Sequence, residues 1–301
     1  MLFNSYVFIF VFLPISIVMF YASRAYFGSK AAQVSLVVCS LFFYGWWNPK
    51  YLLLILASAI FNFTFGKILA SRSRTIIYIG AIAGNVLLLG YYKYLNFFVD
   101  NVNALTSSAY ALEQIILPLA ISFFTFQQIS YLTSCFKTNV AENNFVRYLL
   151  FICFFPQLIA GPIVHHKEIL KQFTSTAFGR INPHLMVIGL CIFTIGLAKK
   201  LILADNLALY VDPVFTTAQD GGNFSNGDAW MALLAYKFQL YFDFSGYADM
   251  AVGLGLLFGI HLPINFESPY KARNIFDFWN RWHTTLARFM RVHIYRPLAR
   301  R

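Results

Sequence analysis

The chain has 301 residues, of which 59% are hydrophobic, 19% are aromatic and only 12% are charged. Soluble domains carry about 25% charged residues. This composition excludes an ordinary soluble domain and predicts an all-α, polytopic membrane protein. The net charge is +11, and residues 267–301 hold eight basic residues against two acids. Because the surrounding apolar runs already require a lipid bilayer as partner, this basic end does not indicate nucleic-acid binding.

Apolar runs along the whole chain predict the membrane spans, because a helix needs about 20 apolar residues to cross the hydrocarbon core. The expected spans are 6–21, 32–47, 51–69, 76–92, 115–136, 146–164, 185–204, 230–242 and 251–264. Several are short, so roughly eight to ten transmembrane or re-entrant helices are expected. No fixed repeat or low-complexity linker interrupts them, which predicts a single domain over residues 1–301.

The distribution of charge predicts the orientation in the membrane, because positive residues near spans favour the cytoplasmic side. Residues 24–30 and 72–74 carry basic residues and no acid, whereas residues 201–230 contain four acids and no Lys or Arg. We therefore expect an extracytoplasmic amino terminus, an extracytoplasmic acidic segment and a cytoplasmic basic end. The first apolar run lacks the flanks of a cleaved signal peptide, so it is expected to be a retained span.

Cysteine and histidine patterns do not indicate a metal site or a disulfide framework. The four cysteines show no CxxC pairing, and each lies in or beside an apolar run: Cys39, Cys135, Cys153 and Cys191. They are expected to be buried thiols. His165 and His166 lead into Lys167 and Glu168, which predicts a solvated loop, and the same interpretation applies to His184 and His261.

Two expected spans carry features that plain spans lack. Thr125, Gln127 and Gln128 fall in mid-span, so they should face a protein interior or a wet cavity, and hydrogen bonds between helices would explain them equally well. Pro156 and Pro162 predict a helix that is broken inside the membrane. Such a break is tolerated only where it is buried in protein or lines a cavity.

A polar cluster interrupts the apolar sequence at residues 236–249. Tyr236, Gln239, Asp243 and Tyr247 share one face if the helix is unbroken, and Gly246 is a candidate break. Carboxylates in a hydrophobic run are costly and are functional-site hypotheses by default. Asp243 and Asp249 could contact substrate, or they could hold a loop or orient a His or Arg. The glycines at 253, 255 and 259 predict a small-residue face for close helix packing.

The stretch 274–283 reads Asn-Ile-Phe-Asp-Phe-Trp-Asn-Arg-Trp-His. If it is helical, four side chains share one face: Phe276, Trp279, Asn280 and His283. Asp277 and Arg281 then form an i,i+4 ion pair. A titratable imidazole among aromatic rings is the best candidate for chemistry in this chain. The alternative is an interfacial anchor, with Trp and Arg at the headgroup level and His283 incidental.

Four motifs in this order resemble the membrane-bound O-acyltransferase family, and most closely its bacterial alginate O-acetylase branch. They are Met-Leu-Phe-Asn-Ser-Tyr-Val-Phe at 1–8, Phe-Pro-Gln-Leu-Ile-Ala-Gly-Pro at 155–162, Leu-Tyr-Phe-Asp-Phe-Ser-Gly-Tyr-Ala-Asp-Met-Ala-Val-Gly at 240–253 and Phe-Trp-Asn-Arg-Trp-His at 278–283. The dipeptides Asn265-Phe266 and Pro269-Tyr270 also match the family. The resemblance implies a many-helix enzyme of the cell inner membrane. It would pass an acyl group, usually acetyl, from a cytoplasmic thioester such as acetyl-CoA to a hydroxyl of an extracytoplasmic polysaccharide or cell-envelope glycan.

The resemblance also implies a periplasmic partner protein in some systems, and no bound cofactor or metal. It assigns His283 a catalytic or acyl-positioning role, which suits imidazole as a general base. The residues expected to line a substrate tunnel or to support it are Gln239, Asp243, Ser245, Tyr247, Asp249, Trp279, Asn280 and Trp282. The acceptor stays open between alginate, peptidoglycan, another exopolysaccharide and a lipid-linked sugar.

The end of the chain departs from the family pattern. After Trp-His the family continues with Arg-Asp-Tyr and Pro-Leu-Gly-Gly, whereas this chain has Arg-Val-His at 291–293 and Arg-Pro-Leu-Ala-Arg-Arg at 296–301. The family's second His, in a later Trp-His-Gly helix, has no counterpart. The chain is therefore expected to be incomplete at its carboxyl end. Two alternatives to an enzyme stay open: a non-catalytic remnant or scaffold, and a transporter or flippase.

Overall fold

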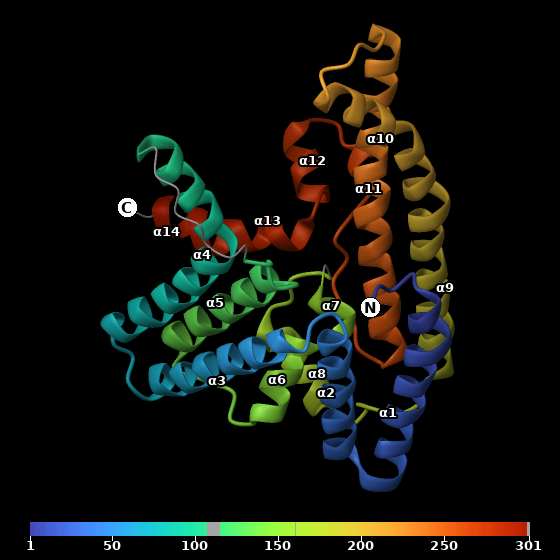
Figure 1. The fold of residues 1–301 in the computed structure, drawn as a ribbon. Helices are drawn as coiled ribbons and strands as arrows, with labels where there is room; N and C mark the ends of the chain where they lie inside the picture. Colours follow the sequence, from blue (N-terminus) through green and yellow to red (C-terminus); the bar gives the residue numbers. More distant parts are fainter. Residues whose placement is uncertain (107–114, 160, 300–301) are drawn as a thin grey trace. The chain divides into compact units, whose positions relative to one another are not determined.

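The computed structural model describes residues 1–106, 115–159 and 161–299, and its regular elements there are all helical, which confirms the expected all-α class (Figure 1). The helices form two compact units. The first unit contains residues 1–32, 161–162 and 176–299, and the second contains residues 33–159 and 163–175. These units are defined by how closely their residues pack, which does not test whether residues 1–301 form a single family domain. The single domain stays a prediction.

The first unit contains a long helical hairpin and a chain of short helices after it. Its elements are η1 (Phe8–Phe12), α1 (Leu13–Phe27), α9 (Pro183–Ala198), η2 (Lys199–Ala204), α10 (Asp205–Gln219), α11 (Asn226–Leu257), η3 (Pro269–Lys271), α12 (Ile275–Arg281), α13 (Thr284–Met290), η4 (Arg291–Tyr295) and α14 (Arg296–Ala299). Three of these, η1, η2 and η4, are π-helical turns that continue into α-helices. Such turns are rare and are frequently found at functional sites.

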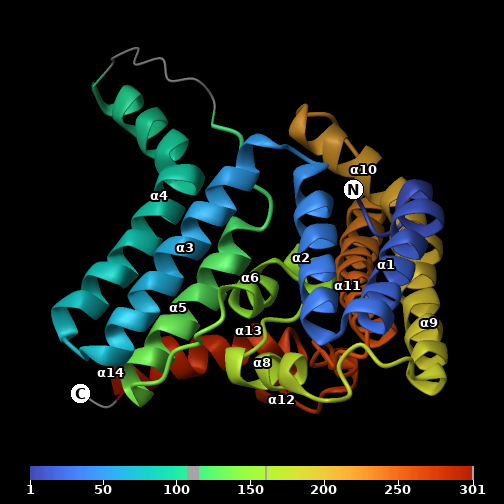
Figure 2. The same cartoon turned by 90° about the horizontal axis from the view of Figure 1, so that it is seen from below.

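The second unit is built on three long helices that lie side by side, namely α3 (Lys50–Ser71), α4 (Thr75–Thr106) and α5 (Ile121–Thr138) (Figure 2). Its elements are α2 (Ser29–Gly45), whose first turn belongs to the first unit, α3 (Lys50–Ser71), α4 (Thr75–Thr106), α5 (Ile121–Thr138), α6 (Phe145–Cys153), α7 (Phe155–Leu158) and α8 (His166–Thr174). Every residue from Tyr148 of α6 to Leu158 of α7 is buried. The short interval between the two helices confirms the predicted broken helix and shows it buried in protein, as a break at that depth requires.

Four helical stretches of the described chain are long and apolar enough to cross a membrane: Phe8–Phe27, Lys50–Ser71, Thr75–Thr106 and Pro183–Gln219. Three of the four contain spans that the sequence predicted, and Phe8–Phe27 overlaps the predicted span 6–21. Two other predicted spans, 230–242 and 251–264, are wrong as separate elements, because α11 runs unbroken from Asn226 to Leu257. The exact number of membrane helices stays a prediction.

The mid-span polar residues of α5 face the interior of the second unit, as predicted. Gln128 is fully buried, and its Oε1 accepts hydrogen bonds from Ser58 Oγ (2.8 Å) and Asn62 Nδ2 (2.9 Å) of α3. Asn62 also exchanges two hydrogen bonds with Asn85 of α4, at 2.7 and 3.0 Å. Thr125 is fully buried as well. These bonds join three helices, so the interpretation as interhelical hydrogen bonding holds.

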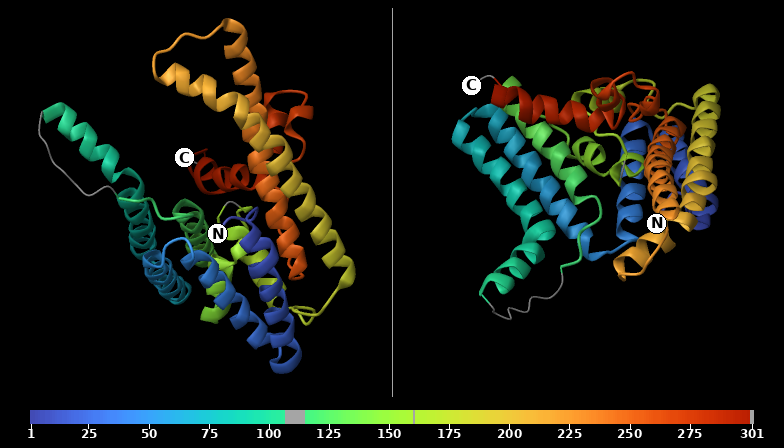
Figure 3. Two further views of the ribbon diagram at one scale, coloured as in Figure 1. Left: turned by 45° about the vertical axis from the view of Figure 1, so that its right-hand side comes forward. Right: turned by 90° about the horizontal axis from the view of Figure 1, so that it is seen from above.

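Close glycine contacts bring α9 and α11 together, and Figure 3 shows the two helices side by side. A Cβ at Gly196 would lie 2.6 Å from the carbonyl oxygen of Gly246, and a Cβ at Gly189 would lie 2.7 Å from that of Gly253. The prediction of a small-residue face is therefore confirmed for Gly253. Gly246 is not a break, because its missing side chain admits the neighbouring backbone.

Two further predictions about single residues are wrong. His166 is 5% exposed and packs edge-on to Tyr131, at 5.4 Å between ring centroids, so it does not belong to a solvated loop. It begins the amphipathic helix α8 and points to the buried face. Cys191 is exposed on α9, whereas the other three cysteines are buried thiols as expected.

Candidate active site

His283 lies beyond the end of α12, and this corrects the predicted helical face. The helix ends at Arg281, Trp282 is extended, and His283 adopts the left-handed conformation with φ 46° and ψ 54°. Phe276 and Trp279 are 74% and 57% exposed, whereas His283 is only 8% exposed. The shared face of Phe276, Trp279 and His283 is therefore wrong, and the imidazole is directed to the interior.

Backbone hydrogen bonds on both sides fix the turn at His283. The amide of Glu267 donates to the carbonyl of Arg281 at 3.0 Å, and the amide of Thr284 donates to the carbonyl of Asn265, also at 3.0 Å. The chain segment before α12 thus pairs with the segment after it. These bonds hold the left-handed residue, which a non-glycine side chain adopts only when its surroundings over-determine it.

Side-chain hydrogen bonds reinforce the same turn. The Thr284 hydroxyl donates to the carbonyl of Ile264 at 2.6 Å. Asn265 is 1% exposed, and its Oδ1 accepts from the hydroxyl (2.7 Å) and the amide (3.4 Å) of Thr285. The residues on either side of the imidazole are therefore held by a buried amide, which restricts the position of the His283 backbone.

Aromatic rings surround the imidazole. The ring of Phe244, from α11, stands edge-on to His283 at 4.8 Å between centroids, and the ring of Phe266 lies at 6.3 Å. Phe266 also packs edge-on against Trp282 at 5.1 Å. Burial among these rings lowers the pKa of His283 to about 4. The imidazole is therefore neutral at physiological pH, and its Nδ1 makes no hydrogen bond to another described residue.

The polar residues of α12 tie that helix to its neighbours. The Asp277–Arg281 pair is present as predicted, with Nε donating to the carboxylate at 2.8 Å. This bond and the donating amide of Arg273 lower the pKa of Asp277. Asn280 accepts a hydrogen bond from Arg291 at 2.8 Å. In the described chain, neither Asn280 nor Trp279 makes a hydrogen bond to His283. Their place on a tunnel wall stays a prediction.

Two of the carboxylates of α11, those of Asp243 and Asp249, are ion-paired to the lysines of η2. Asp249 pairs with Lys199 at 2.5 Å, and Asp243 pairs with Lys200 at 2.6 Å. Lys200 also contacts Asp205 at 2.9 Å. Neither carboxylate hydrogen-bonds to a His or an Arg in the described chain. Their observed role is to join α11 to η2.

The remaining predicted residues of α11 contact neither His283 nor the ion pairs through hydrogen bonds in the described chain. The Ser245 hydroxyl is fully buried, and neither it nor the Tyr247 hydroxyl nor Gln239 Oε1 has a hydrogen-bond partner in the described chain. The ring of Tyr247 stacks on Phe3 at 4.6 Å. No three His, Cys, Asp or Glu side chains gather as a metal site would require, within the residues described. The expected absence of a bound metal stays a prediction.

The sequence analysis assigned no role to several residues that build this region. Phe244 and Phe266 form the wall beside His283, and Asn265 holds its turn. Lys199 and Lys200 neutralise the carboxylates. The pairing of the lysines with the carboxylates could have been predicted from the sequence. Two consecutive cations in one apolar run and two carboxylates in another are each costly unless they are paired. The roles of Asn265 and Phe266 depend on contacts far along the chain, which residue spacing does not reveal.

The family model for membrane-bound O-acyltransferases matches residues 41–301. The chain belongs to this family. Three relatives illustrate its range. The chain is 46% identical to the peptidoglycan O-acetyltransferase of Helicobacter pylori, with 99% of the chain and 62% of the relative aligned. It is 37% identical to a protein of Pseudomonas aeruginosa named probable alginate O-acetylase, over 99% of the chain and 57% of the relative.

A third relative, the teichoic acid D-alanyltransferase of Bacillus subtilis, is 30% identical over 59% of the chain and 44% of its own length. The chain thus spans 62% and 57% of the two relatives that it matches throughout. Family membership and a multi-pass membrane fold follow from these matches and from the apolar helices. The activity, the acceptor and the partners of this chain are proposals.

Proposed function

We propose that the chain is an O-acyltransferase that passes an acetyl group from a cytoplasmic thioester to a hydroxyl of an extracytoplasmic glycan. Acetyl-CoA is the proposed donor and the cell inner membrane the proposed location. Family membership supports the reaction class, and the relatives named for peptidoglycan and alginate support a glycan acceptor. The peptidoglycan relative has the higher identity, so peptidoglycan is the first acceptor to test. Transfer through a periplasmic partner protein is the alternative to direct transfer by the chain, and the step and the assay below concern direct transfer.

The observation that carries this proposal is the buried, backbone-fixed imidazole of His283. In the proposed step the acceptor hydroxyl attacks the thioester carbonyl carbon, a C–O bond forms and the C–S bond breaks. The imidazole takes the hydroxyl proton and returns it to the leaving thiolate, which departs as the free thiol. A neutral ring is required for the first transfer, and the lowered pKa of His283 supplies it at physiological pH.

The aromatic wall supports the same role. A nonpolar site excludes water, and this limits hydrolysis of the thioester and strengthens the electrostatic interactions within it. The hydrogen bonds around Asn265 hold the backbone of the turn, so the imidazole is positioned before substrate arrives. The low pKa also makes His283 a weak base in the free protein. Negative charge that develops on the reacting oxygen would raise its proton affinity during the step.

The test is single-turnover acetyl transfer from labelled acetyl-CoA in proteoliposomes that contain the chain and a peptidoglycan fragment. We expect label on the acceptor with the native chain, and a decrease of about 100-fold or more with His283→Ala. His184→Ala is the matched control, because His184 is an exposed histidine of α9 and lies outside the proposed site. Undiminished transfer by His283→Ala would remove the assigned role, and no transfer by the native chain would contradict the proposed activity of this chain.

The transporter alternative depends on charged residues inside apolar helices. The pairs Lys199–Asp249 and Lys200–Asp243 give those charges structural partners. Paired charges stabilise a helical hairpin and need no transported ion to account for them. The observations therefore favour the transferase over a transporter. The proteoliposome assay also separates the transferase from a non-catalytic scaffold, because only the transferase moves label to the glycan.

A further inference from the structure

One end of the second unit is strongly basic, and the proposed function does not use it. Seven basic residues lie at the ends of α3 and α5, in the loop after α3 or in the helices α6 and α8: Lys67, Arg72, Arg74, Lys137, Arg147, Lys167 and Lys171. The two acids in these segments or in the loop after α5 are Glu142 and Glu168. The hydroxyl of Ser73 donates to the carbonyl of Phe136 at 3.2 Å, so the ends of α3 and α5 lie together.

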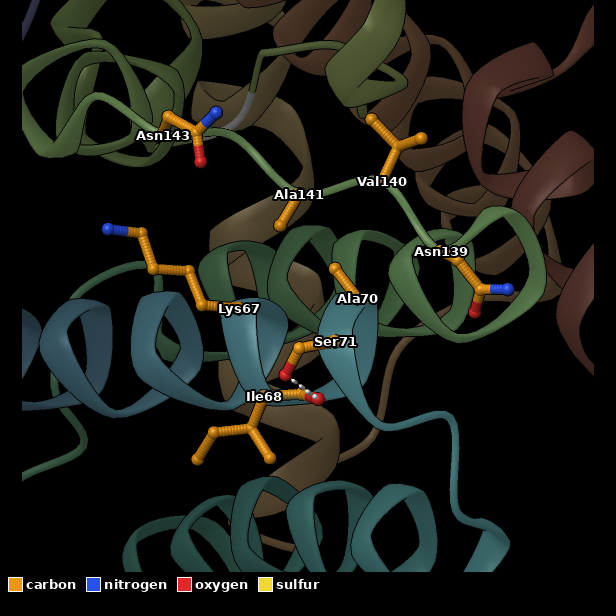
Figure 4. A pocket seen from close by; sticks show the side chains of 8 residues that line it. All are labelled: Lys67, Ile68, Ala70, Ser71, Asn139, Val140, Ala141 and Asn143. Atoms are coloured by element: carbon orange, nitrogen blue, oxygen red, sulfur yellow. Dashed lines mark hydrogen bonds between the residues drawn. The ribbon is translucent and has the colours of Figure 1, made fainter.

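An open pocket of about 640 Å³ lies at this basic end, between the last turns of α3 and the segment that follows α5. Its polar lining residues are Lys67, Ser71, Asn139 and Asn143, and its apolar lining residues are Ile68, Ala70, Val140 and Ala141. Figure 4 shows the Lys67 side chain extending from α3 toward the segment that carries Asn143. The pocket therefore offers one ammonium group, two amides and an apolar floor.

The charge of this pocket is not neutralised within the described chain. Lys67 makes no ion pair there, and its Nζ lies 4.4 Å from the ring of Phe63. The side chains of Asn139 and Asn143 make no hydrogen bond to another described residue. Glu142 is nearby, but its carboxylate is bound to Arg147 at 2.7 Å. The donors of the pocket are therefore available to an anion from outside the chain.

A second hollow, of about 300 Å³, shares Val140 and Ala141 with the first. Lys167 and Lys171 line it from the exposed face of α8, whose opposite face buries Ile169 and Phe173. Because the apolar face of α8 packs inside the second unit, its lysines are directed outward. Helix α8 thus adds positive charge beside the Lys67 pocket.

We propose that the Lys67 pocket binds the phosphate group of an anionic phospholipid. An ammonium group binds phosphate as a point charge, and amide N–H groups donate to the remaining phosphate oxygens. Basic pockets between membrane helices on the cytoplasmic side bind anionic headgroups in this manner. The positive-inside rule places this basic end on the cytoplasmic side. The lipid would contact Lys67, Asn139 and Asn143, and Lys167 and Lys171 would attract it electrostatically.

A lipid fits better than a soluble phosphate compound because of where the pocket lies. Lys67 is in the last turns of α3, a candidate membrane span, and a lysine there reaches from the apolar helix to the headgroup level. The adjoining start of α4 exposes Ile76 and Ile79, at 79% and 59%. Acyl chains can therefore lie along exposed apolar side chains while the phosphate occupies the pocket.

The test is native mass spectrometry of the detergent-solubilised chain, titrated separately with phosphatidylglycerol and with phosphatidylcholine. We expect Lys67→Gln to weaken binding of phosphatidylglycerol about fivefold, and the combined Lys167→Gln and Lys171→Gln change to weaken it further. Lys93→Gln is the matched control, because Lys93 also lies over an aromatic ring, that of Tyr94 at 5.5 Å, but in α4 and away from the pocket. Binding of phosphatidylcholine should not change in any variant.

Competition distinguishes a lipid from a soluble phosphate. Pyrophosphate and coenzyme A are added to the complex of the native chain with phosphatidylglycerol, and we expect neither to displace the lipid. Displacement by either compound would assign the pocket to soluble phosphates and overturn the lipid proposal. Equal binding of phosphatidylglycerol by the native chain and by Lys67→Gln would overturn the assignment of this pocket as the binding site. These readouts do not depend on acyl transfer, so they are independent of the proposed function.

Discussion

At the scale of the residue, the backbone at His283 stores strain at the point where chemistry is proposed. A left-handed conformation costs roughly 1–2 kcal/mol for a residue with a Cβ. The structure offsets this cost with hydrogen bonds from residues on both sides, through Asn265 and Glu267. Strain of this kind concentrates where a side chain must be held in one position. The His283 turn is therefore best explained as a device that directs the imidazole inward.

The lowered pKa of His283 predicts how stability depends on pH. In the unfolded chain the imidazole takes up a proton near pH 6.5, whereas in the folded chain it does so only near pH 4. The free energy of unfolding is therefore highest above pH 6.5, as far as His283 is concerned. It decreases as the pH falls toward 4, by at most about 3 kcal/mol. The thermal midpoint in detergent should decrease less over this range in His283→Gln than in the native chain. Parallel curves for the two proteins would contradict the buried, neutral imidazole.

Sequence could identify His283 but not its conformation. The type of residue and the Asp277–Arg281 pair could be predicted from local spacing, whereas the aromatic rings that contact His283 could not. The end of α12 could not be predicted from local spacing, because it depends on amides and carbonyls of residues 264–267. These residues lie more than ten positions before the turn. Periodicity describes a helix that continues, and it contains no information about a distant segment that competes for the same backbone groups.

At the scale of the element, α9 and α11 are joined by two kinds of contact. Glycines at 189, 196, 246 and 253 bring the backbones close, and the lysines of η2 reach the carboxylates of α11. The spans were predictable from composition because lipid requires continuous apolar helices. The continuity of α11 could not be predicted from composition. Gly246 lowers the local helix propensity, but its packing against Gly196 overrides this effect.

Substitution of the contact glycines should destabilise the hairpin. In Gly196→Ala the new Cβ would lie 2.6 Å from the Gly246 carbonyl oxygen, so the helices must separate at a cost of about 1–3 kcal/mol. Gly80→Ala is the control, because a Cβ at this α4 position meets nothing within 4 Å. The control should leave the thermal midpoint unchanged or raise it. Equal midpoints for Gly196→Ala and Gly80→Ala would show that the close contact does not support the fold.

The Lys199–Asp249 pair should behave as a coupled unit. Lys199→Met leaves the carboxylate without its cation in an apolar setting, and Asp249→Leu leaves the ammonium group without its anion. Each single change should destabilise the chain, whereas the double change removes both charges and should cost less than the sum of the two. A double-mutant cycle on thermal unfolding should give a coupling free energy of roughly 1–3 kcal/mol. Additive effects would indicate that the pair contributes no stability.

At the scale of the whole molecule, the loop charges predict one orientation. If the amino terminus is extracytoplasmic and α1, α2 and α3 each cross the membrane, residues 72–74 would lie in the cytoplasm, where their basic residues favour them. Crossings by α4 and α5 would return the chain to the same side. The hairpin of α9, α10 and α11 would then place its acidic connection outside. This orientation stays a prediction from the loop charges.

Cysteine labelling provides a direct measurement of this orientation. Cys191 is the exposed cysteine and is first replaced by Ala, because the other three are buried. Ser73→Cys and Asn223→Cys then introduce single reactive thiols in two exposed loops. A membrane-impermeant maleimide applied to intact spheroplasts should label Asn223→Cys and not Ser73→Cys, and permeabilisation should allow both to react. The reverse pattern would place the basic loops outside, and it would move the Lys67 pocket to the extracytoplasmic surface.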